Sequence, residues 1–150
     1  DGLIPMSTRS NIAIQEKDGS IRVIYCHWDR YLAHNGKMLF DYYSSAAKLR
    51  KLIDLGSISR LAPEIGTKTD FDNPKDGQVV AYGRDRGEED TEADYYPDLE
   101  TYVKSFEGVG WIEYIYVFDV KTKTWSYFTN NDKNLLPLKD YVLGIPFKTA

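Results

Sequence analysis

The stretch Arg9–Trp28, RSNIAIQEKDGSIRVIYCHW, decides the fold. Apolar and polar residues alternate in both halves of it, and the turn pair Asp18-Gly19 stands between the halves. Alternation is the pattern of a half-buried strand, and an Asp-Gly pair between two alternating runs is the strongest short-range signal of a β-hairpin. We therefore predict a hairpin with strands at residues 9–17 and 20–28.

Helical periodicity follows the hairpin. Apolar residues recur at intervals of three and four between Gly36 and Leu55, and Gly56 stands where a C-terminal helix cap belongs. Ser44 can cap the second half of this segment, which predicts two helices rather than one. Residues 57–77 hold two prolines and two glycines and are predicted to form a long loop.

The second half of the chain predicts a further hairpin. We expect a short strand at 78–82, a helix that Pro97 opens, and two strands at 111–120 and 125–128. The apolar residues of the tail, 134–150, are expected to pack back onto the sheet. The order of elements predicts an α+β domain with a mainly antiparallel sheet of about five strands and helices packed on one face.

Length, charge and cysteine content limit the function. The 150 residues suit a single domain, which we assign to 6–150, because residues 1–5 precede a natural-looking start at Met6 and read as a cloning remnant. The net charge of -4 argues against direct nucleic-acid binding. The single cysteine, Cys26, cannot form an internal disulfide, and no apolar run approaches the length of about 20 residues that spans a membrane. We therefore expect an intracellular protein that does not bind membranes.

The block Tyr25–Asp29, YCHWD, gathers chemically active side chains at the end of a predicted strand. Neighbouring strand residues point to opposite faces, so Cys26 and His27 cannot easily pair as nucleophile and base, and the base would have to be His34 or a distant carboxylate. We favour a buried, unreactive Cys26. One cysteine and two histidines lack metal-ligand spacing, so we expect no metal; a divalent site of carboxylates in the acidic segment is the alternative.

The block Tyr82–Glu88, YGRDRGE, has the residue types of a phosphate or carboxylate site. Arg84 and Arg86 are flanked by glycines that let a ligand approach the backbone, and Tyr82 could stack on a base. In the alternative interpretation the two arginines neutralise their acidic neighbours across a solvated turn. The acidic run that follows is usually a solvated face, and alternatively a surface that imitates nucleic-acid phosphates.

Five blocks of the sequence resemble, in order, a family of small proteins encoded by tailed bacteriophages, prophages and plasmids. They are MSTRSN (6–11), YCHWD (25–29), NGK (35–37), LGSIS (55–59) and YGRDRGE (82–88). The resemblance runs from Met6 to about Phe128; family members usually carry glycine where this chain has Arg30. The family is functionally uncharacterised. The resemblance implies a phage or mobile-element accessory protein of the bacterial cytoplasm and brings no catalytic residue with it.

Binding without catalysis is the function that we favour from the sequence. Such a protein would counter host defences or redirect host machinery, by sequestering a phosphorylated or nucleotide-like small molecule or by blocking a host protein, with no cofactor. The side chains expected to bind the ligand lie at strand ends and turns: Arg9, His27, Trp28, Asp29, Tyr82, Arg84 and Arg86.

Two other functions stay open. The first is a small nucleotide-directed hydrolase or transferase, with His27 or a carboxylate as general base and the arginines stabilising developing charge. The second is an acidic inhibitor of the DNA-mimic type, which would act through the carboxylates from Glu88 to Asp94.

Overall fold

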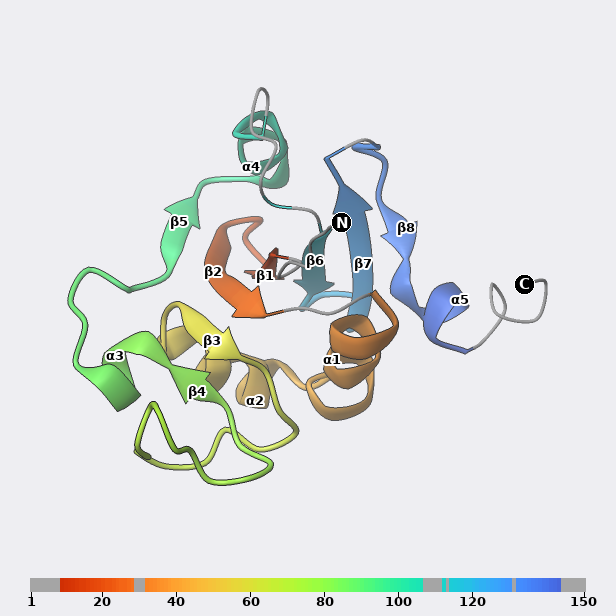
Figure 1. Ribbon diagram of the computed structural model, residues 1–150. Helices are drawn as coiled ribbons and strands as arrows, with labels where there is room; N and C mark the ends of the chain where they lie inside the picture. The colour runs from red at the N-terminus through yellow and green to blue at the C-terminus, as the bar shows by residue number, and fades with distance from the viewer. Residues whose placement is uncertain (1–8, 29–31, 107–111, 113, 131, 144–150) are drawn as a thin grey trace, which may run out of the picture.

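The computed structural model describes residues 9–28, 32–106, 112, 114–130 and 132–143, and within them one open sheet of eight strands (Figure 1). The spatial order is β4-β3-β2-β1-β6-β7-β8, and β5 pairs with β2. The strands are β1 (Ser10–Gln15), β2 (Ile21–Trp28), β3 (Ile58–Arg60), β4 (Val80–Ala81), β5 (Asp94–Tyr96), β6 (Tyr114–Asp119), β7 (Thr124–Thr129) and β8 (Leu136–Pro137).

The predicted first hairpin is confirmed. β1 and β2 pair antiparallel with Ser10 opposite Cys26. At the turn, the Glu16 amide donates to the Ser20 carbonyl at 2.9 Å, and Gly19 takes a φ of 92°, a conformation that glycine adopts without strain. The second predicted hairpin is also present, as the antiparallel pair of β6 and β7.

The sheet is mainly antiparallel, as predicted, but it has more strands than the expected five. Its two parallel pairs are β1 with β6 and β2 with β3. The outer edge of β2 is shared: β3 pairs with its end at Cys26 and Trp28, and β5 pairs with its start at Ile21–Val23. The additional strands β3, β5 and β8 have two or three residues each, too few to show alternation in a sequence.

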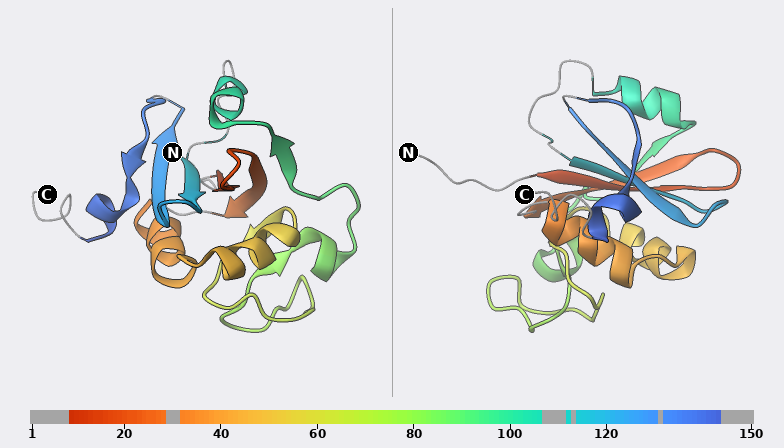
Figure 2. Two further views of the ribbon diagram at one scale, coloured as in Figure 1. Left: turned by 180° about the vertical axis from the view of Figure 1, so that it is seen from behind. Right: turned by 90° about the vertical axis from the view of Figure 1, so that its right-hand side faces the viewer.

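Helices cover both faces of the sheet, which corrects the prediction that they pack on one face (Figure 2). On one face lie α1 (Lys37–Tyr42) and α2 (Ala46–Asp54); on the other lies α4 (Leu99–Lys104). The remaining helical segments are a π-helical turn, η1 (Leu32–Gly36), and the short helices α3 (Tyr82–Arg86) and α5 (Leu138–Val142). No helix in the described ranges is long and apolar enough to span a membrane.

The two faces carry separate cores. The first core, under α1 and α2, includes Ile12, Ile14 and Leu49. The second core includes Ala13, Val23, Tyr102, Phe106, Ile115 and Phe128. Tyr102 and Phe106 come from α4 and the turn after it, so α4 covers the second face with its aromatic side chains. The predicted packing of the tail is confirmed in part: β8 pairs with β7 and Leu138 is fully buried, whereas Leu135, Leu136 and Leu143 are exposed and residues 144–150 lie outside the described part of the chain.

The segment from Gly36 to Leu55 forms two helices, as predicted, with the cap displaced by one residue. Ser45, not Ser44, caps α2 by accepting from the Lys48 amide at 3.5 Å. The Ser44 hydroxyl instead donates to the Phe40 carbonyl at 2.6 Å. The sequence alone could not choose between adjacent serines, because both can adopt the extended cap conformation.

Gly56 ends α2 with a φ of 78° and allows another segment to approach closely. A Cβ at this position would lie 2.1 Å from the Thr91 carbonyl oxygen, and the adjacent Ser57 amide donates to that oxygen at 2.8 Å. The glycine therefore fixes where the acidic segment crosses the sheet.

We expect Gly56→Ala to destabilise the protein far more than Gly87→Ala. Gly87 follows α3 with a similar φ of 73°, but nothing lies within 4 Å of a Cβ added there. Its substitution should cost only the left-handed strain of about 1 kcal/mol, whereas Gly56→Ala must also displace backbone, adding about 1–3 kcal/mol. Urea denaturation of both variants measures the difference; equal losses would contradict the close approach.

Candidate ligand-binding site

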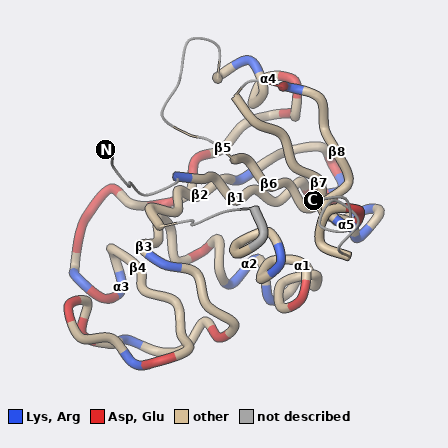
Figure 3. The backbone as a smooth tube through the Cα atoms, turned by 45° about the vertical axis from the view of Figure 1, so that its right-hand side comes forward, with Lys and Arg blue, Asp and Glu red and all other residues tan. Residues whose placement is uncertain are grey.

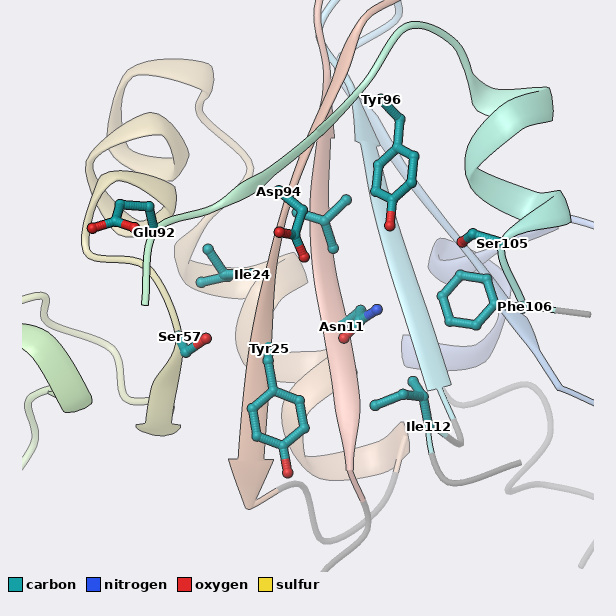
Figure 4. A pocket seen from close by; sticks show the side chains of 11 residues that line it. Asn11, Ile24, Tyr25, Ser57, Glu92, Asp94, Tyr96, Ser105, Phe106 and Ile112 are labelled. Carbon is teal, nitrogen blue, oxygen red and sulfur yellow. The ribbon is translucent and has the colours of Figure 1, made fainter. Parts of the chain in front are cut away.

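A pocket of about 240 Å³ lies on the second face of the sheet, and we call it the sheet pocket (Figure 4). β1 and β2 form its floor, the segment that leads into β5 forms one wall, and the end of α4 forms the other. Its lining residues are Asn11, Val23, Ile24, Tyr25, Ser57, Glu92, Asp94, Tyr96, Ser105, Phe106 and Ile112.

The sheet pocket combines aromatic and polar walls. Glu92, Asp94 and Tyr96 come from the segment that forms one wall, Phe106 lies on the opposite wall, and the Tyr25 hydroxyl lies at one end (Figure 4). Asn11 is held in the floor, where its side-chain amide donates to the Tyr102 hydroxyl at 3.2 Å. The pocket therefore offers rings that can stack on a planar ligand and oxygens that can accept hydrogen bonds from it.

Four side chains form a cluster at the Tyr25 end, and we call Arg9, Tyr25, His27 and Trp28 the Tyr25 cluster. Tyr25 and His27 lie two residues apart on β2, so both point to the second face, and the Tyr25 oxygen lies 2.8 Å from His27 Nδ1. The His27 and Trp28 rings contact each other edge to face at 5.0 Å. The Trp28 side chain is 52% exposed, so it borders solvent at the edge of the cluster.

The Tyr25 cluster has one permanent charge. Burial raises the pKa of Tyr25, although a hydrogen bond with Arg9 opposes the rise, so the phenol stays protonated. Burial, together with the nearby charge of Arg9, lowers the pKa of His27. The imidazole is therefore neutral at pH 7, and Arg9 supplies the positive charge.

A second group of side chains, the α3 stack of Phe71, Tyr82, Arg86 and Glu88, adjoins this cluster. The Arg86 guanidinium lies 4.3 Å from the centre of the Phe71 ring and 5.1 Å from that of Tyr82, and it pairs with Glu88. Burial also raises the pKa of Tyr82, so this phenol, like that of Tyr25, is protonated and uncharged at neutral pH.

Arg84 points away from both groups into the protein. Its guanidinium bonds the Asp85 carboxylate at 2.9 Å, the Ile65 carbonyl at 2.8 Å and the Val79 carbonyl at 2.7 Å. Asp85 is buried and also accepts from the Thr69 amide at 3.0 Å. Burial would raise the pKa of Asp85, but the bonds from Arg84 and the backbone outweigh it and lower the pKa.

The structure gives different surroundings to Arg84 and Arg86, which the sequence analysis placed in the same expected site. Arg84 neutralises an acidic neighbour, as the alternative interpretation of its block has it, although across a buried loop rather than a solvated turn. Arg86 pairs with Glu88 and both side chains remain half-exposed, which is the neutralisation across a solvated turn that the alternative interpretation describes; its guanidinium also lies against two rings. Asp29 and Arg30 lie outside the described residues.

Cys26 is buried in the first core, which confirms the interpretation of it as a buried small hydrophobic residue. Its thiol donates to the Trp28 carbonyl at 3.2 Å, on the face opposite to His27. His34 shares a hydrogen bond with Asn35 at 2.8 Å. Among the residues that the structure describes, no three His, Cys, Asp or Glu side chains gather closely enough to hold a metal ion.

Several pocket residues were not singled out from the sequence. Tyr25 could have been, because it alternates with His27 on one strand and must share its face. Glu92, Asp94 and Tyr96 stand in an acidic stretch whose pairing with β2 gave no signal in the sequence. These residues reach the site through contacts between segments far apart in the chain.

Comparisons with protein-family models, with curated protein sequences and with solved structures gave no match to this chain.

We expect Arg84→Gln to destabilise the protein and Arg86→Gln to leave it nearly unchanged. The first change leaves the buried Asp85 carboxylate without its cation, which costs about 3 kcal/mol. The second removes a half-exposed ion pair and a ring contact that together contribute about 1 kcal/mol. Thermal unfolding of the two variants compares them, and equal losses would show that Arg84 has no special structural role.

The lowered pKa of His27 predicts a pH-dependent stability. Below the unfolded value of 6.5 and above the folded value, the unfolded chain binds more protons, so the free energy of unfolding should rise with pH across that window. His27→Gln should flatten this rise, and the control His34→Gln, which leaves His27 in place, should retain it. Chemical denaturation between about pH 5 and pH 7.5 measures the slope; a slope unchanged in His27→Gln would contradict the assignment.

Proposed function

We propose that this chain is a small, non-catalytic binding protein that sequesters a phosphorylated, nucleotide-like ligand in the sheet pocket. The observation that carries the proposal is the order of chemical groups in and beside the pocket: the Arg9 cation, which bonds the Tyr25 side chain outside the lining at one end, then aromatic rings, and carboxylates on one wall. A nucleotide has the complementary order of phosphate, ring and hydrogen-bond donors.

The Tyr25 cluster suits the phosphate. Arg9 supplies a charge that persists at every physiological pH, and an arginine can bind a phosphate with two parallel hydrogen bonds. Tyr25 and His27 are neutral and hydrogen-bonded to each other, so they can orient around an added anion without gaining or losing a proton. Trp28 borders the same end and could cover the ligand.

The two walls suit the nucleoside. Tyr96 presents a half-buried ring that can stack on a base, and the buried ring of Phe106 supplies an apolar surface beside it. Glu92 and Asp94 can accept hydrogen bonds from ribose hydroxyls or from an exocyclic amine, as carboxylates do when they read a base edge. The volume of about 240 Å³ lies below that of most drug-sized sites, which favours one nucleoside unit with its phosphate toward solvent.

The resemblance to phage, prophage and plasmid proteins supports the biological side of the proposal. A binder of this kind would act in the bacterial cytoplasm, where removal of a host nucleotide counters or redirects host machinery. Inhibition of a host protein is the other form of the same role, and the acidic segment between α3 and β5 is the surface that it would use (Figure 3).

Catalysis is the second candidate, and one observation favours it. His27 is neutral at pH 7 because its pKa is lowered, and a general base must be unprotonated to accept a proton. A hydrolase or transferase would place the scissile bond of the nucleotide at the same end of the pocket. Prolonged incubation of any bound nucleotide, followed by mass spectrometry, separates turnover from sequestration.

We expect native mass spectrometry of the protein, together with a thermal-shift screen of mononucleotides and dinucleotides, to identify a ligand. A ligand at about one hundred times its Kd should raise Tm by about 5 °C or more. Arg9→Gln should abolish the shift, because the phosphate loses its cation. Lys104→Gln, which removes one charge from α4 outside the pocket, should keep it.

The walls provide a second arm of the same experiment. Glu92→Gln with Asp94→Asn should change which nucleotides bind, whereas Glu100→Gln with Asp132→Asn, two acidic positions that do not line the pocket, should not. If no nucleotide binds the unaltered protein, the small-molecule proposal fails. Affinity capture of a host protein, repeated with the carboxylates of 88–94 neutralised, would then test the acidic surface.

A further inference from the structure

A second pocket lies on the opposite face of the sheet, and we call it the turn pocket. It has a volume of about 440 Å³ and is lined by Lys17, Ser44, Ser45, Ala46, Arg50, Val120 and Lys123. These residues come from the turn between β1 and β2, the start of α2, and the turn between β6 and β7. The two turns lie at the same end of the sheet, above α2 (Figure 2).

The turn pocket is lined by three cationic side chains from three separate elements, Lys17, Arg50 and Lys123. No carboxylate belongs to its described lining. Like charges repel, so their convergence costs free energy unless an anion balances them. Both lysine residues are exposed, and no described ion pair involves either of them.

The nearby carboxylates are already engaged elsewhere. Glu16 accepts two hydrogen bonds from Arg50, at 2.7 and 3.0 Å, which hold the guanidinium in place beside the pocket. Asp18 accepts from the Ser20 amide and hydroxyl, at 2.9 and 2.6 Å, within its own turn. Asp119 accepts from the Lys121 amide at 2.9 Å. The charges of Lys17 and Lys123 therefore remain for a ligand.

Lys123 occupies a backbone conformation that lysine rarely adopts. Its φ is 60°, in the left-handed region where glycine or asparagine is the usual choice and where another residue is strained by about 1–2 kcal/mol. A lysine at this position presents a long cation at the pocket that glycine could not supply. Ser45, across the pocket, accepts only from the Lys48 amide at 3.5 Å and keeps its own O–H as a donor.

We propose that the turn pocket is a second binding site, specific for a small polyanion that carries phosphate groups. Lys17 and Lys123 would bind the phosphate oxygens as exposed point charges from two sides, with Ser45 donating from a third. The volume falls within the range of small-ligand sites and exceeds what a single phosphate fills, which favours a pyrophosphate or a bisphosphate. The site is independent of the sheet pocket, which lies on the other face and has carboxylates on its wall.

Isothermal titration with pyrophosphate, with inorganic phosphate as the smaller probe, tests the proposal. We expect pyrophosphate to bind more tightly than phosphate, and the combined Lys17→Gln and Lys123→Gln variant to lose at least about tenfold in affinity per lysine. The matched control is Lys51→Gln with Lys121→Gln, which removes two charges from α2 and from the same turn without touching the pocket lining. Its affinity should stay within about twofold of the unaltered protein.

Three results would overturn the proposal. Equal losses in the two double variants would show nonspecific attraction to a basic end of the molecule. A Kd weaker than about 1 mM for pyrophosphate in the unaltered protein would show that the charges do not form a site. Loss of pyrophosphate binding in Arg9→Gln, with the lysine variants unaffected, would assign the anion to the sheet pocket instead.

Discussion

β1 is buried on both of its faces and bonded along both of its edges. Ile12 and Ile14 belong to the first core and Ala13 to the second, while β2 pairs antiparallel on one edge and β6 parallel on the other. A strand enclosed in this way requires helices on both faces of the sheet. α1 and α2 cover the first face broadly, but α4 covers the second face only at one end (Figure 2). The sheet pocket is the part of that second face which α4 and β5 leave open.

Two local contacts then position the segments that surround the pocket. Gly56 lets the backbone at Thr91 approach so closely that the Ser57 amide bonds its carbonyl, and this contact sets the path of Glu92 and Asp94 along the wall. The buried pair of Arg84 and Asp85 ties the loop before β4 to α3, because the arginine bonds loop carbonyls while the carboxylate bonds the loop amide of Thr69. Phe71 in that loop therefore lies against Tyr82 at a ring distance of 5.4 Å. Gly56 and the Arg84–Asp85 ion pair do not contact a ligand themselves. They position the aromatic and acidic groups that could bind one.

The parts of the fold that the sequence predicts are those with a local physical signal. Alternation and the Asp-Gly turn identify the first hairpin, and the apolar spacing with Gly56 identifies α2. The short strands carry no such signal, since their pairing depends on which edge of β2 remains free. The candidate site also has a part that the sequence predicts and a part that it does not. The residues of β2 can be recognised by their chemically active side chains, but Arg84 and Arg86 have equivalent local surroundings in the sequence. Only the carbonyls of Ile65 and Val79, brought in by the loop, make one arginine structural and leave the other exposed.

The net charge of -4 conceals an unequal distribution of charge between the two faces. The wall of the sheet pocket carries Glu92 and Asp94, whereas the turn pocket is lined by three cations. Charged groups separated by more than about 10 Å in physiological salt are largely screened from one another. The electrostatic potential in each pocket is therefore set by the charges near it and not by the net charge of the protein. An acidic protein can therefore hold anions at two places, provided that the local groups are cationic: Arg9 at the end of one pocket, and Lys17 with Lys123 at the other. The overall charge argues against a long nucleic-acid backbone, which would meet the whole surface, and small phosphorylated molecules are the class of ligand that we propose for both sites.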